Sequence, residues 1–152
     1  MKTTTLTPEK NYQTSIVVNN NASEVFEKIS QVQEWWATNF EGSASKQGDV
    51  FTVHFGDTYV TFEITEAIPG KKVVWYVTDC YLPWLKDKTE WNGTEVVFEI
   101  SETGNGTRVD MTHVGLTPEV ECYNGCEKGW NHHIQDSLVA LLTEGKGMPQ
   151  NG

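Results

Sequence analysis

The stretch Thr-Arg-Val-Asp-Met-Thr-His-Val-Gly-Leu-Thr-Pro, residues 107–118, decides the fold together with the pattern that follows it. Side chains of two kinds alternate from Thr107 to Val114, which predicts a strand with two different faces, and Val109, Met111 and His113 share one of them. After Pro118 the period changes. A stripe recurs at steps of three and four residues, as one face of a helix does: Tyr123, Cys126, Trp130, Ile134, Ser137, Leu138 and Leu141.

The start of this predicted helix carries favourable residues. Thr117 can cap free backbone amides, and Pro118 suits the first helical position. Two acids, Glu119 and Glu121, would lie at the positive end of the helix dipole. A helix of about 24 residues is about 36 Å long. Its apolar stripe therefore needs an equally broad surface to cover.

The rest of the chain supplies that surface as strands. Tyr12–Val18 reads as a first strand, followed by a helix opening at Ala22 and a second short helix that holds Val32, Trp35 and Trp36. Residues 40–48 read as a loop. Four more alternating segments, separated by turn residues, precede the strand at 107–114: 50–55, 58–67, 72–78 and 94–101. The pattern predicts an antiparallel meander.

These elements predict one α+β domain. A curved antiparallel sheet of about six strands would wrap around the C-terminal helix, with two short helices after the first strand, because the helix stripe and the inner strand faces must bury each other. At 152 residues the chain is long enough for one substantial core. We expect the domain to span residues 12–144 and residues 1–11 and 145–152 to form flexible tails.

Charge and composition narrow the classes of partner. The chain holds 11 basic and 21 acidic residues, a net charge of −10, which disfavours binding to nucleic acid or to an anionic membrane. No stretch reaches the length of a membrane span, and the first residues lack an apolar signal region. We therefore expect a soluble cytoplasmic protein, in which Cys80, Cys122 and Cys126 are reduced.

Three short motifs resemble the signature positions of a known family. They are Val73-Val74-Trp75, Thr112-His113-Val114-Gly115-Leu116 and Gly129-Trp130. Over residues 12–142 the chain resembles the SRPBCC superfamily and, more narrowly, the family named for the activator of the heat-shock-protein ATPase. The resemblance implies a helix-grip fold, related to START and birch-pollen-allergen domains, with a deep apolar cavity between sheet and helix. Members bind lipids, sterols, hormones, polyketides or partner proteins, and some are enzymes.

The aromatic side chains are the main candidates for binding a ligand. Six tryptophans in one domain supply large apolar surfaces with indole N–H groups, which suits a pocket with a few polar atoms. The alternative for each residue is ordinary core. The predicted ligand-binding set combines inward strand positions with the helix stripe and the 79–93 insertion: Phe51, Phe62, Trp75, Trp84, Trp91, Met111, His113, Trp130 and Ile134.

His113 is the best polar candidate, because its strand parity points it inward near the start of the helix. It could hydrogen-bond a ligand or act as an acid or base, or it could tie the strand to the helix. His132 and His133 are adjacent and cannot share a helix face, and His54 belongs to the outer face. We therefore predict no metal site and no cofactor.

The cysteines and carboxylates offer weaker alternatives. Cys122 and Cys126 lie four residues apart on one helix face and could form a redox pair, or a metal site with Cys80, but buried inert thiols are the preferred interpretation. Most strand carboxylates have outward parity, and hydrolase, phosphate-loop, dinucleotide and metalloprotease motifs are missing from the sequence. We assign no catalytic residue.

Residues 79–93 interrupt the regular meander with Tyr-Leu-Pro-Trp-Leu, which is too apolar for a free loop. The preferred interpretation extends the flanking strands into a longer hairpin. The alternatives are a lid over the cavity and a contact surface for a homodimer. Together these features favour non-catalytic binding of a small hydrophobic or aromatic ligand. The rival hypotheses are a co-chaperone-like interaction domain and a cyclase or hydrolase that uses His113.

Overall fold

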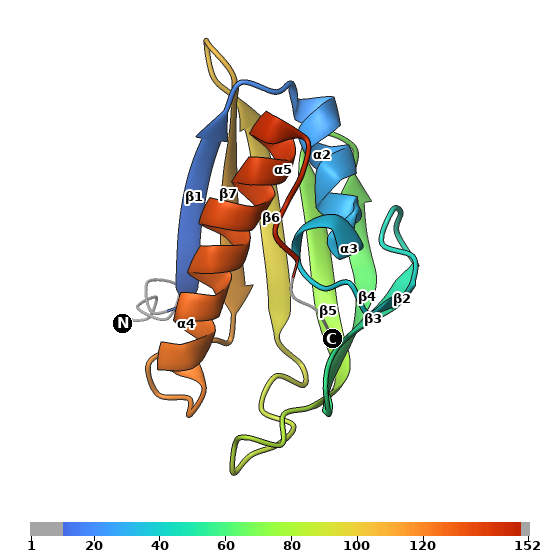
Figure 1. Ribbon diagram of the computed structural model, residues 1–152, viewed down its shortest axis with the longest axis vertical. Helices are drawn as coiled ribbons and strands as arrows, with labels where there is room; N and C mark the ends of the chain where they lie inside the picture. Colours follow the sequence, from blue (N-terminus) through green and yellow to red (C-terminus); the bar gives the residue numbers. More distant parts are fainter. Residues whose placement is uncertain (1–10, 150–152) are drawn as a thin grey trace, which may run out of the picture.

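The alternating segments form one antiparallel sheet in the computed structural model, which describes residues 11–149. Seven strands within this range pair in the order β1-β7-β6-β5-β4-β3-β2 (Figure 1). Their bounds are β1 (Tyr12–Val18), β2 (Phe40–Gly42), β3 (Val50–Phe55), β4 (Thr58–Ile68), β5 (Lys72–Tyr81), β6 (Glu95–Glu102) and β7 (Thr107–Val114). The predicted α+β fold with a curved antiparallel sheet is confirmed.

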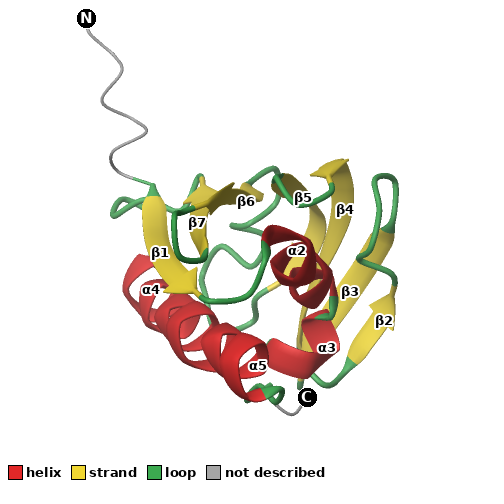
Figure 2. Ribbon diagram, turned by 90° about the horizontal axis from the view of Figure 1, so that it is seen from above, coloured by secondary structure: helices red, strands yellow, loops and turns green. Residues whose placement is uncertain are grey.

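The helices cover the concave face of this sheet (Figure 2). They are α2 (Ala22–Ser30), α3 (Val32–Trp35) and a C-terminal helix composed of α4 (Tyr123–Asn131), a π-helical segment η1 (His132–Leu138) and α5 (Val139–Glu144). Asn21 caps α2, because its side-chain oxygen accepts a hydrogen bond from the backbone N–H of Glu24 at 2.8 Å. None of the helices in the described range has the length and apolar character that a bilayer crossing needs.

The last strand has the two faces that the sequence predicts. Thr107, Val109, Met111 and His113 are all buried, and their neighbours in β7 are more exposed. β7 pairs with β1 on one side and with β6 on the other. Beyond β7, the carbonyl of Leu116 accepts a hydrogen bond from the backbone N–H of Tyr12 at 2.8 Å. The junction between strand and helix is thereby fixed to the first strand.

Two predicted boundaries are wrong. The C-terminal helix begins at Tyr123 rather than at Pro118, because residues 117–122 form turns and Cys122 occupies the N-cap position. Residues 40–48 contain the short edge strand β2, which pairs with β3. A three-residue strand has no periodic pattern to detect. Gly42 marks it instead, since its φ is +99° and a Cβ atom there would lie 2.2 Å from the carbonyl oxygen of Val50.

The π-helical segment has a physical reason in the spacing of the buried side chains. Residues that are all buried recur at every fourth position: Cys122, Cys126, Trp130, Ile134, Leu138 and Leu142. In a regular α-helix each four-residue step rotates the side chain by about 40° beyond a full turn, so the series would drift away from the sheet. The wider i→i+5 turns of η1 reduce this drift and keep the stripe on one face.

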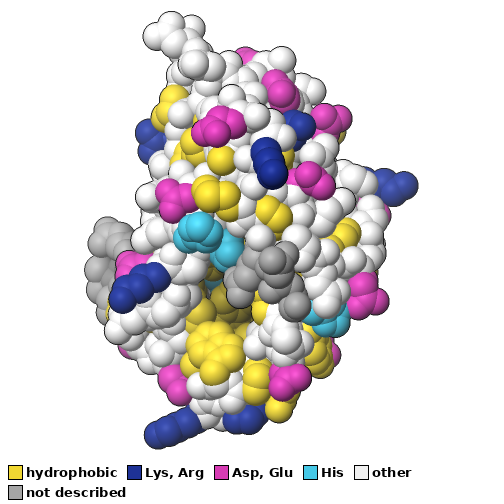
Figure 3. Space-filling model, in the orientation of Figure 1, with side chains coloured by type: hydrophobic (Ala, Val, Ile, Leu, Met, Phe, Trp, Pro, Cys, Tyr) yellow, Lys and Arg dark blue, Asp and Glu magenta, His cyan; other side chains and the backbone are white. Residues whose placement is uncertain are grey.

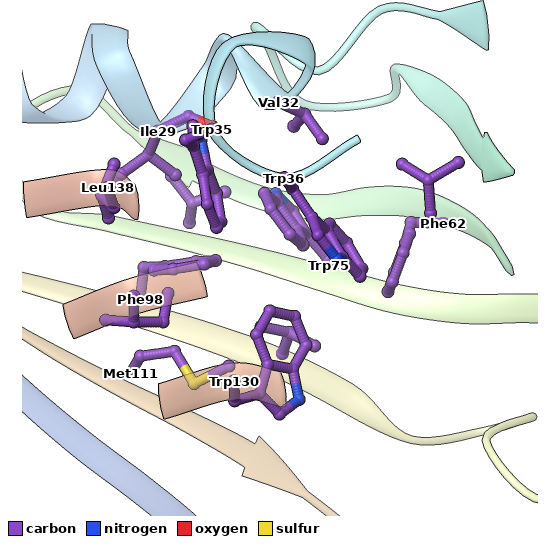
Figure 4. Packing of buried hydrophobic residues seen from close by; sticks show 14 of the residues in the cluster. Ile29, Val32, Trp35, Trp36, Phe62, Trp75, Phe98, Met111, Trp130 and Leu138 are labelled. Atoms are coloured by element: carbon purple, nitrogen blue, oxygen red, sulfur yellow. The ribbon is translucent and has the colours of Figure 1, made fainter. Parts of the chain in front are cut away.

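The interior is filled by indole and phenyl rings. Trp35, Trp36 and Trp75 are buried. The planes of Trp36 and Trp75 differ by 3°, with centroids 6.0 Å apart (Figure 4). Phe98 meets Trp75 edge-on, at 4.8 Å between centroids. Offset and edge-on ring pairs of this kind stabilise a core beyond their buried area. Helix α3 therefore fills much of the volume between the sheet and the C-terminal helix.

The chain after α5 is tied back to the domain. Gly147 is buried, and a Cβ atom at this position would lie 2.4 Å from the carbonyl oxygen of Glu34. The hydroxyl of Ser137 donates to the carbonyl of Trp35 at 2.6 Å and accepts from the backbone N–H of Met148 at 2.7 Å. The domain thus extends past residue 144, and residues 145–149 are not the free tail that was predicted. The remaining tail residues, 1–10 and 150–152, lie outside the described range.

Candidate ligand cavity

A cavity of about 370 Å³ opens at the end of the molecule where α4 begins. Figure 3 shows a hollow with hydrophobic side chains in and around it, below a histidine. Four parts of the chain contribute side chains to the wall: the end of α3, the β3–β4 hairpin, the 79–93 insertion and α4 with the first turn of η1. The lining residues are Trp36, Phe55, Thr58, Val60, Leu82, Trp84, Trp91, Gly125, Cys126, Gly129, Trp130 and His133.

Three indole rings form one side of this cavity. The centroid of Trp130 lies 4.9 Å from that of Trp36 and 6.1 Å from that of Trp91, and the planes of Trp130 and Trp91 differ by 11°. The C-terminal helix, the residue directly after α3 and the insertion each supply one of these rings. The cavity therefore depends on tertiary packing between segments that are far apart in the sequence.

The insertion closes over the helix start through two reciprocal caps. The carboxylate of Glu90 accepts hydrogen bonds from the backbone N–H groups of Glu121 and Cys122, at 3.0 and 2.9 Å. The carboxylate of Glu121 in turn accepts from the backbone N–H of Lys86 at 2.9 and 3.1 Å. Charged acceptors make comparatively strong hydrogen bonds. Each segment thus satisfies backbone donors that the other leaves free.

The insertion is therefore not the longer hairpin that was preferred. β5 continues to Tyr81, but the return strand β6 begins only at Glu95, and turns occupy the residues between them. Leu82, Leu85 and Trp91 are buried, because they pack inward instead of forming an extended second strand. This arrangement matches the alternative interpretation of the insertion as a lid.

His113 lies behind the indole rings and is fully buried. Its Nδ1 accepts a hydrogen bond from the indole N–H of Trp130 at 3.1 Å, so the ring proton belongs on Nε2. Nε2–H then donates to the hydroxyl of Thr94 at 2.9 Å, and that hydroxyl donates to the carbonyl of Trp91 at 2.6 Å. Burial lowers the pKa of His113 to about 3. Both ring nitrogens are used internally, so His113 ties strand to helix.

Two polar atoms on residues of the cavity wall have no hydrogen-bond partner within the described chain. They are the indole Nε1 of Trp91 and Nδ1 of His133. Burial, with a smaller effect from neighbouring His132, lowers the pKa of His133 to about 4, so its imidazole is neutral at pH 7. Trp75 Nε1 also lacks a partner, but Trp75 belongs to the core. Unpaired buried polar atoms are unusual and call for an explanation at each site.

The cysteines behave differently from the expected reduced thiols. Cys122 and Cys126 are joined by a disulfide, with Cα atoms 5.6 Å apart, within the usual range of about 4.4–6.8 Å. The late start of the helix places Cys122 in the N-cap, where it can reach Cys126 one turn later. Cys80 is a buried free thiol under the insertion, and burial raises its pKa. Its sulfur is therefore protonated and unreactive at neutral pH.

The remaining histidines lie outside the cavity, as their strand and helix positions suggest. His54 is on the outer sheet face, where its Nε2 lies 2.6 Å from the carboxylate of Glu41. His132 is exposed and lies 3.3 Å from the carboxylate of Asp136. Within residues 11–149, no group of three or more histidine, cysteine or acidic side chains is arranged to hold a metal ion.

The structure divides the predicted ligand-binding set. Trp84, Trp91 and Trp130 line the cavity. The other members lie in the filled interior, where α3 packs its indole rings between sheet and helix; these are Phe51, Phe62, Trp75, Met111, His113 and Ile134. Their inward orientation was predicted correctly, but an inward side chain touches a ligand only where the interior is empty.

Several cavity residues were missed by sequence reasoning. Trp36 was assigned only to a short helix, and Phe55, Thr58 and Val60 flank a hairpin turn whose position over the helix has no local signal. Gly125, Gly129 and His133 do have one, since they recur at four-residue steps beside Cys126 and Trp130. A second stripe next to the apolar one could have identified them.

A curved antiparallel sheet that grips a long C-terminal helix, with an apolar cavity at one end, defines a helix-grip protein of the SRPBCC superfamily. The family described as activator of Hsp90 ATPase homolog 1-like protein matches residues 4–143, and the chain belongs to it. A comparison with curated protein sequences found no match.

Several solved structures share this fold. The Aha1 dimer from Colwellia psychrerythraea, solved in solution, is 24% identical with a TM-score of 0.74, over 90% of this chain and 98% of that chain. Protein MLL2253 from Mesorhizobium loti is 15% identical with a TM-score of 0.71, over 91% of this chain and all of that chain. CalU16 from Micromonospora echinospora is 16% identical with a TM-score of 0.64, over 90% and 75% of the two chains.

Proposed function

We propose that this protein binds a small hydrophobic or aromatic ligand, without catalysing a reaction, in the cavity between the helix start, the insertion and the β3–β4 hairpin. The observation that carries the proposal is the cavity itself, open and about 370 Å³ in volume, with a mainly apolar and aromatic wall. Sites for small molecules are usually concave and apolar with a few placed polar groups. Thr58 and His133 supply polar side chains on this wall.

The geometry gives little support to the alternative of a His113-dependent enzyme. A general acid or base must reach the proton that it transfers. His113 is fully buried, is not on the cavity wall and has both ring nitrogens engaged by Trp130 and Thr94. The Cys122–Cys126 disulfide likewise leaves no free thiol on the cavity wall.

Ligand titrations test the proposal. Melting temperature and tryptophan fluorescence would be followed for fatty acids, sterols and uncharged fused aromatics. A ligand at 100 times its dissociation constant stabilises a protein by about 2.7 kcal/mol, which corresponds to a rise of about 5–10 °C for a domain of this size. If no compound moves either signal, the proposal fails.

Two surface variants separate the cavity from nonspecific binding. Trp84→Ala removes a half-exposed cavity ring and should weaken binding with little effect on folding. Val17→Ala, on the exposed face of β1, is the control and should leave binding unchanged. Equal loss in both variants would contradict binding at the cavity.

Homodimer formation through the insertion is a second proposal about partners. It is favoured by Trp84, which is 56% exposed at the cavity mouth, and a related structure of the same fold is an Aha1 dimer. Sedimentation equilibrium of the wild type and Trp84→Ala would test it. A wild-type protein that stays monomeric at high micromolar concentration would exclude the dimer. A co-chaperone role would need a protein-binding surface other than the insertion.

A further inference from the structure

The cavity wall formed by α4 carries two glycines whose presence the backbone does not explain. Gly125 and Gly129 lie four residues apart, both line the cavity and neither has a positive φ. A Cβ atom added at either position would meet no atom within 4 Å, so close packing does not demand glycine. Glycine is nevertheless among the least favourable residues within a helix. The sequence therefore keeps bare backbone on this wall at a cost to helix stability.

The bare helix surface lies among flat aromatic groups. Trp130 and His133 flank Gly129 on the same wall, and Trp36, Trp91 and Trp84 complete the surroundings. Aromatic rings pair in offset-stacked or edge-on arrangements, and a flat ring can lie close to a surface that has no projecting side chains. A flat ligand can approach the helix backbone at Gly125 and Gly129, whereas a bulky one would not use the space that the glycines leave.

The wall also carries no formal charge at neutral pH. It contains no Asp, Glu, Lys or Arg among its lining residues, and His133 is neutral. A buried ionised ligand would lose its hydration without an opposite charge to replace it. An uncharged ligand avoids this loss, and Thr58 and His133 are the polar side chains on the wall with which one oxygen can pair.

Cavity volume limits the size of the ligand. An apolar cavity of about 150 Å³ accommodates benzene, and the present cavity is about 370 Å³. Two or three fused rings would occupy it.

We infer that the cavity accepts a flat, uncharged aromatic molecule of two or three fused rings bearing a hydroxyl or keto oxygen, with Gly125 and Gly129 as the residues that select for flatness. This inference rests on the proposed function and specifies its ligand class. Long-chain carboxylates and ionised aromatic acids are excluded by the same features of the wall.

Matched probes test the ligand class at pH 7. Phenanthrene, 9-phenanthrol and phenanthrene-9-carboxylate share one ring system and differ in oxygen and charge, and palmitate represents long-chain acids. We expect 9-phenanthrol to bind at least tenfold more tightly than either acid. Preferred binding of palmitate or of the aromatic acid overturns the inference and leaves the proposed function intact. A failure of all four probes and of the wider ligand panel overturns both.

Glycine variants test the selecting residues, because stability and binding should change in opposite directions. Gly125→Ala/Gly129→Ala and Gly129→Leu should raise the melting temperature by about 3–8 °C through better helix propensity. The same variants should weaken 9-phenanthrol binding at least tenfold. Asn124→Ala is the control, since it improves propensity on an exposed position of the same turn and should not alter binding. Variants that bind normally, or that lose stability together with binding, contradict the role of the glycines.

Discussion

Single polar residues hold the buried end of the junction between strand and helix. His113 connects the Trp130 indole to the Thr94 hydroxyl, and Thr94 continues the chain to the carbonyl of Trp91. One imidazole thus hydrogen-bonds the indole of Trp130 and meets the indole of Trp91 edge-on, at 4.6 Å between ring centroids. Its neutral form is required, because a proton on Nδ1 would face the N–H of Trp130.

The burial of His113 and His133 predicts a loss of stability in mild acid. Burial lowers the pKa of His113 to about 3 and that of His133 to about 4, whereas an unfolded histidine has a pKa near 6.5. The unfolded state therefore binds more protons below about pH 6.5. The unfolding free energy is fully present above this pH and falls as the pH drops toward 4, by up to about 1.4 kcal/mol per pH unit for each histidine.

Urea unfolding between pH 5 and 7.5 would measure this slope. His113→Gln should make the slope shallower by the share of one histidine, and His113→Gln/His133→Gln should make it shallower still. Comparing slopes rather than absolute stabilities separates the titration from any packing defect in the variants. An unchanged slope in both variants would show that these histidines do not control the acid response.

The close packing around Gly147 predicts that adding a single methyl group at this position lowers the stability of the fold. Its Cβ position lies 2.4 Å from the carbonyl oxygen of Glu34 and 3.1 Å from the Cα of Trp35, both of them backbone atoms that cannot rotate away. We expect Gly147→Ala to lower the unfolding free energy by about 1–3 kcal/mol. Chemical denaturation would measure it, with Met148→Ala, at a half-exposed neighbour, as a control that changes stability by less than about 0.5 kcal/mol.

At the scale of elements, the insertion and the helix start stabilise each other. Neither segment belongs to a helix or a strand: residues 82–93 form turns, and residues 117–122 precede the helix. Glu90 and Glu121 satisfy the free backbone donors across the gap. The position of Trp91 and Trp84 on the cavity wall therefore depends on carboxylates that line no part of the cavity.

Glu121→Ala should loosen the insertion. Loss of the cap on Lys86 and Asp87 is expected to lower the unfolding free energy by about 0.5–1.5 kcal/mol, the usual effect of losing a capping side chain near the surface. Amide hydrogen exchange in residues 82–93 should become faster, while exchange in β6 and β7 stays slow. Glu119→Ala, at an exposed acid two residues earlier, is the control. Equal exchange in both variants would contradict the reciprocal caps.

At the scale of the whole molecule, charge rather than ion pairing governs the response to salt. The net charge is −10, and each ion pair found among the described residues involves a side chain at least 42% exposed. Such pairs contribute about 0–1 kcal/mol and are screened easily. Self-repulsion of the acidic surface is the larger effect, and salt reduces it.

Raising sodium chloride from about 10 to 300 mM at pH 7.5 should therefore raise the melting temperature by a few degrees. Calorimetry would measure it, and repeating the measurement near the isoelectric point provides the control, where the rise should vanish. A melting temperature that falls with salt at pH 7.5 would show that surface ion pairs dominate.

Local patterns predicted the elements well and the cavity poorly. The strands at 12–18, 50–55 and 107–114 have the bounds expected from alternation, because each needs only a two-faced strand. The late start at Tyr123 and the π-helical segment were missed, because both depend on how the helix packs against the sheet. Trp84, Trp91 and Trp130 were predicted for the site, but Trp36 entered it only through the packing of α3.

The sequence by itself determined the order of the elements, the inward face of each strand and the helix stripe, because alternation and helical periodicity are properties of neighbouring residues. Only the tertiary structure decided which inward residues fill the core and which face open space. Phe51, Trp75 and Met111 are as inward as Trp130, yet they lie in the filled interior, where Trp35 and Trp36 stack on Trp75. Whether a volume is filled depends on all the segments that surround it, and no local pattern contains that information.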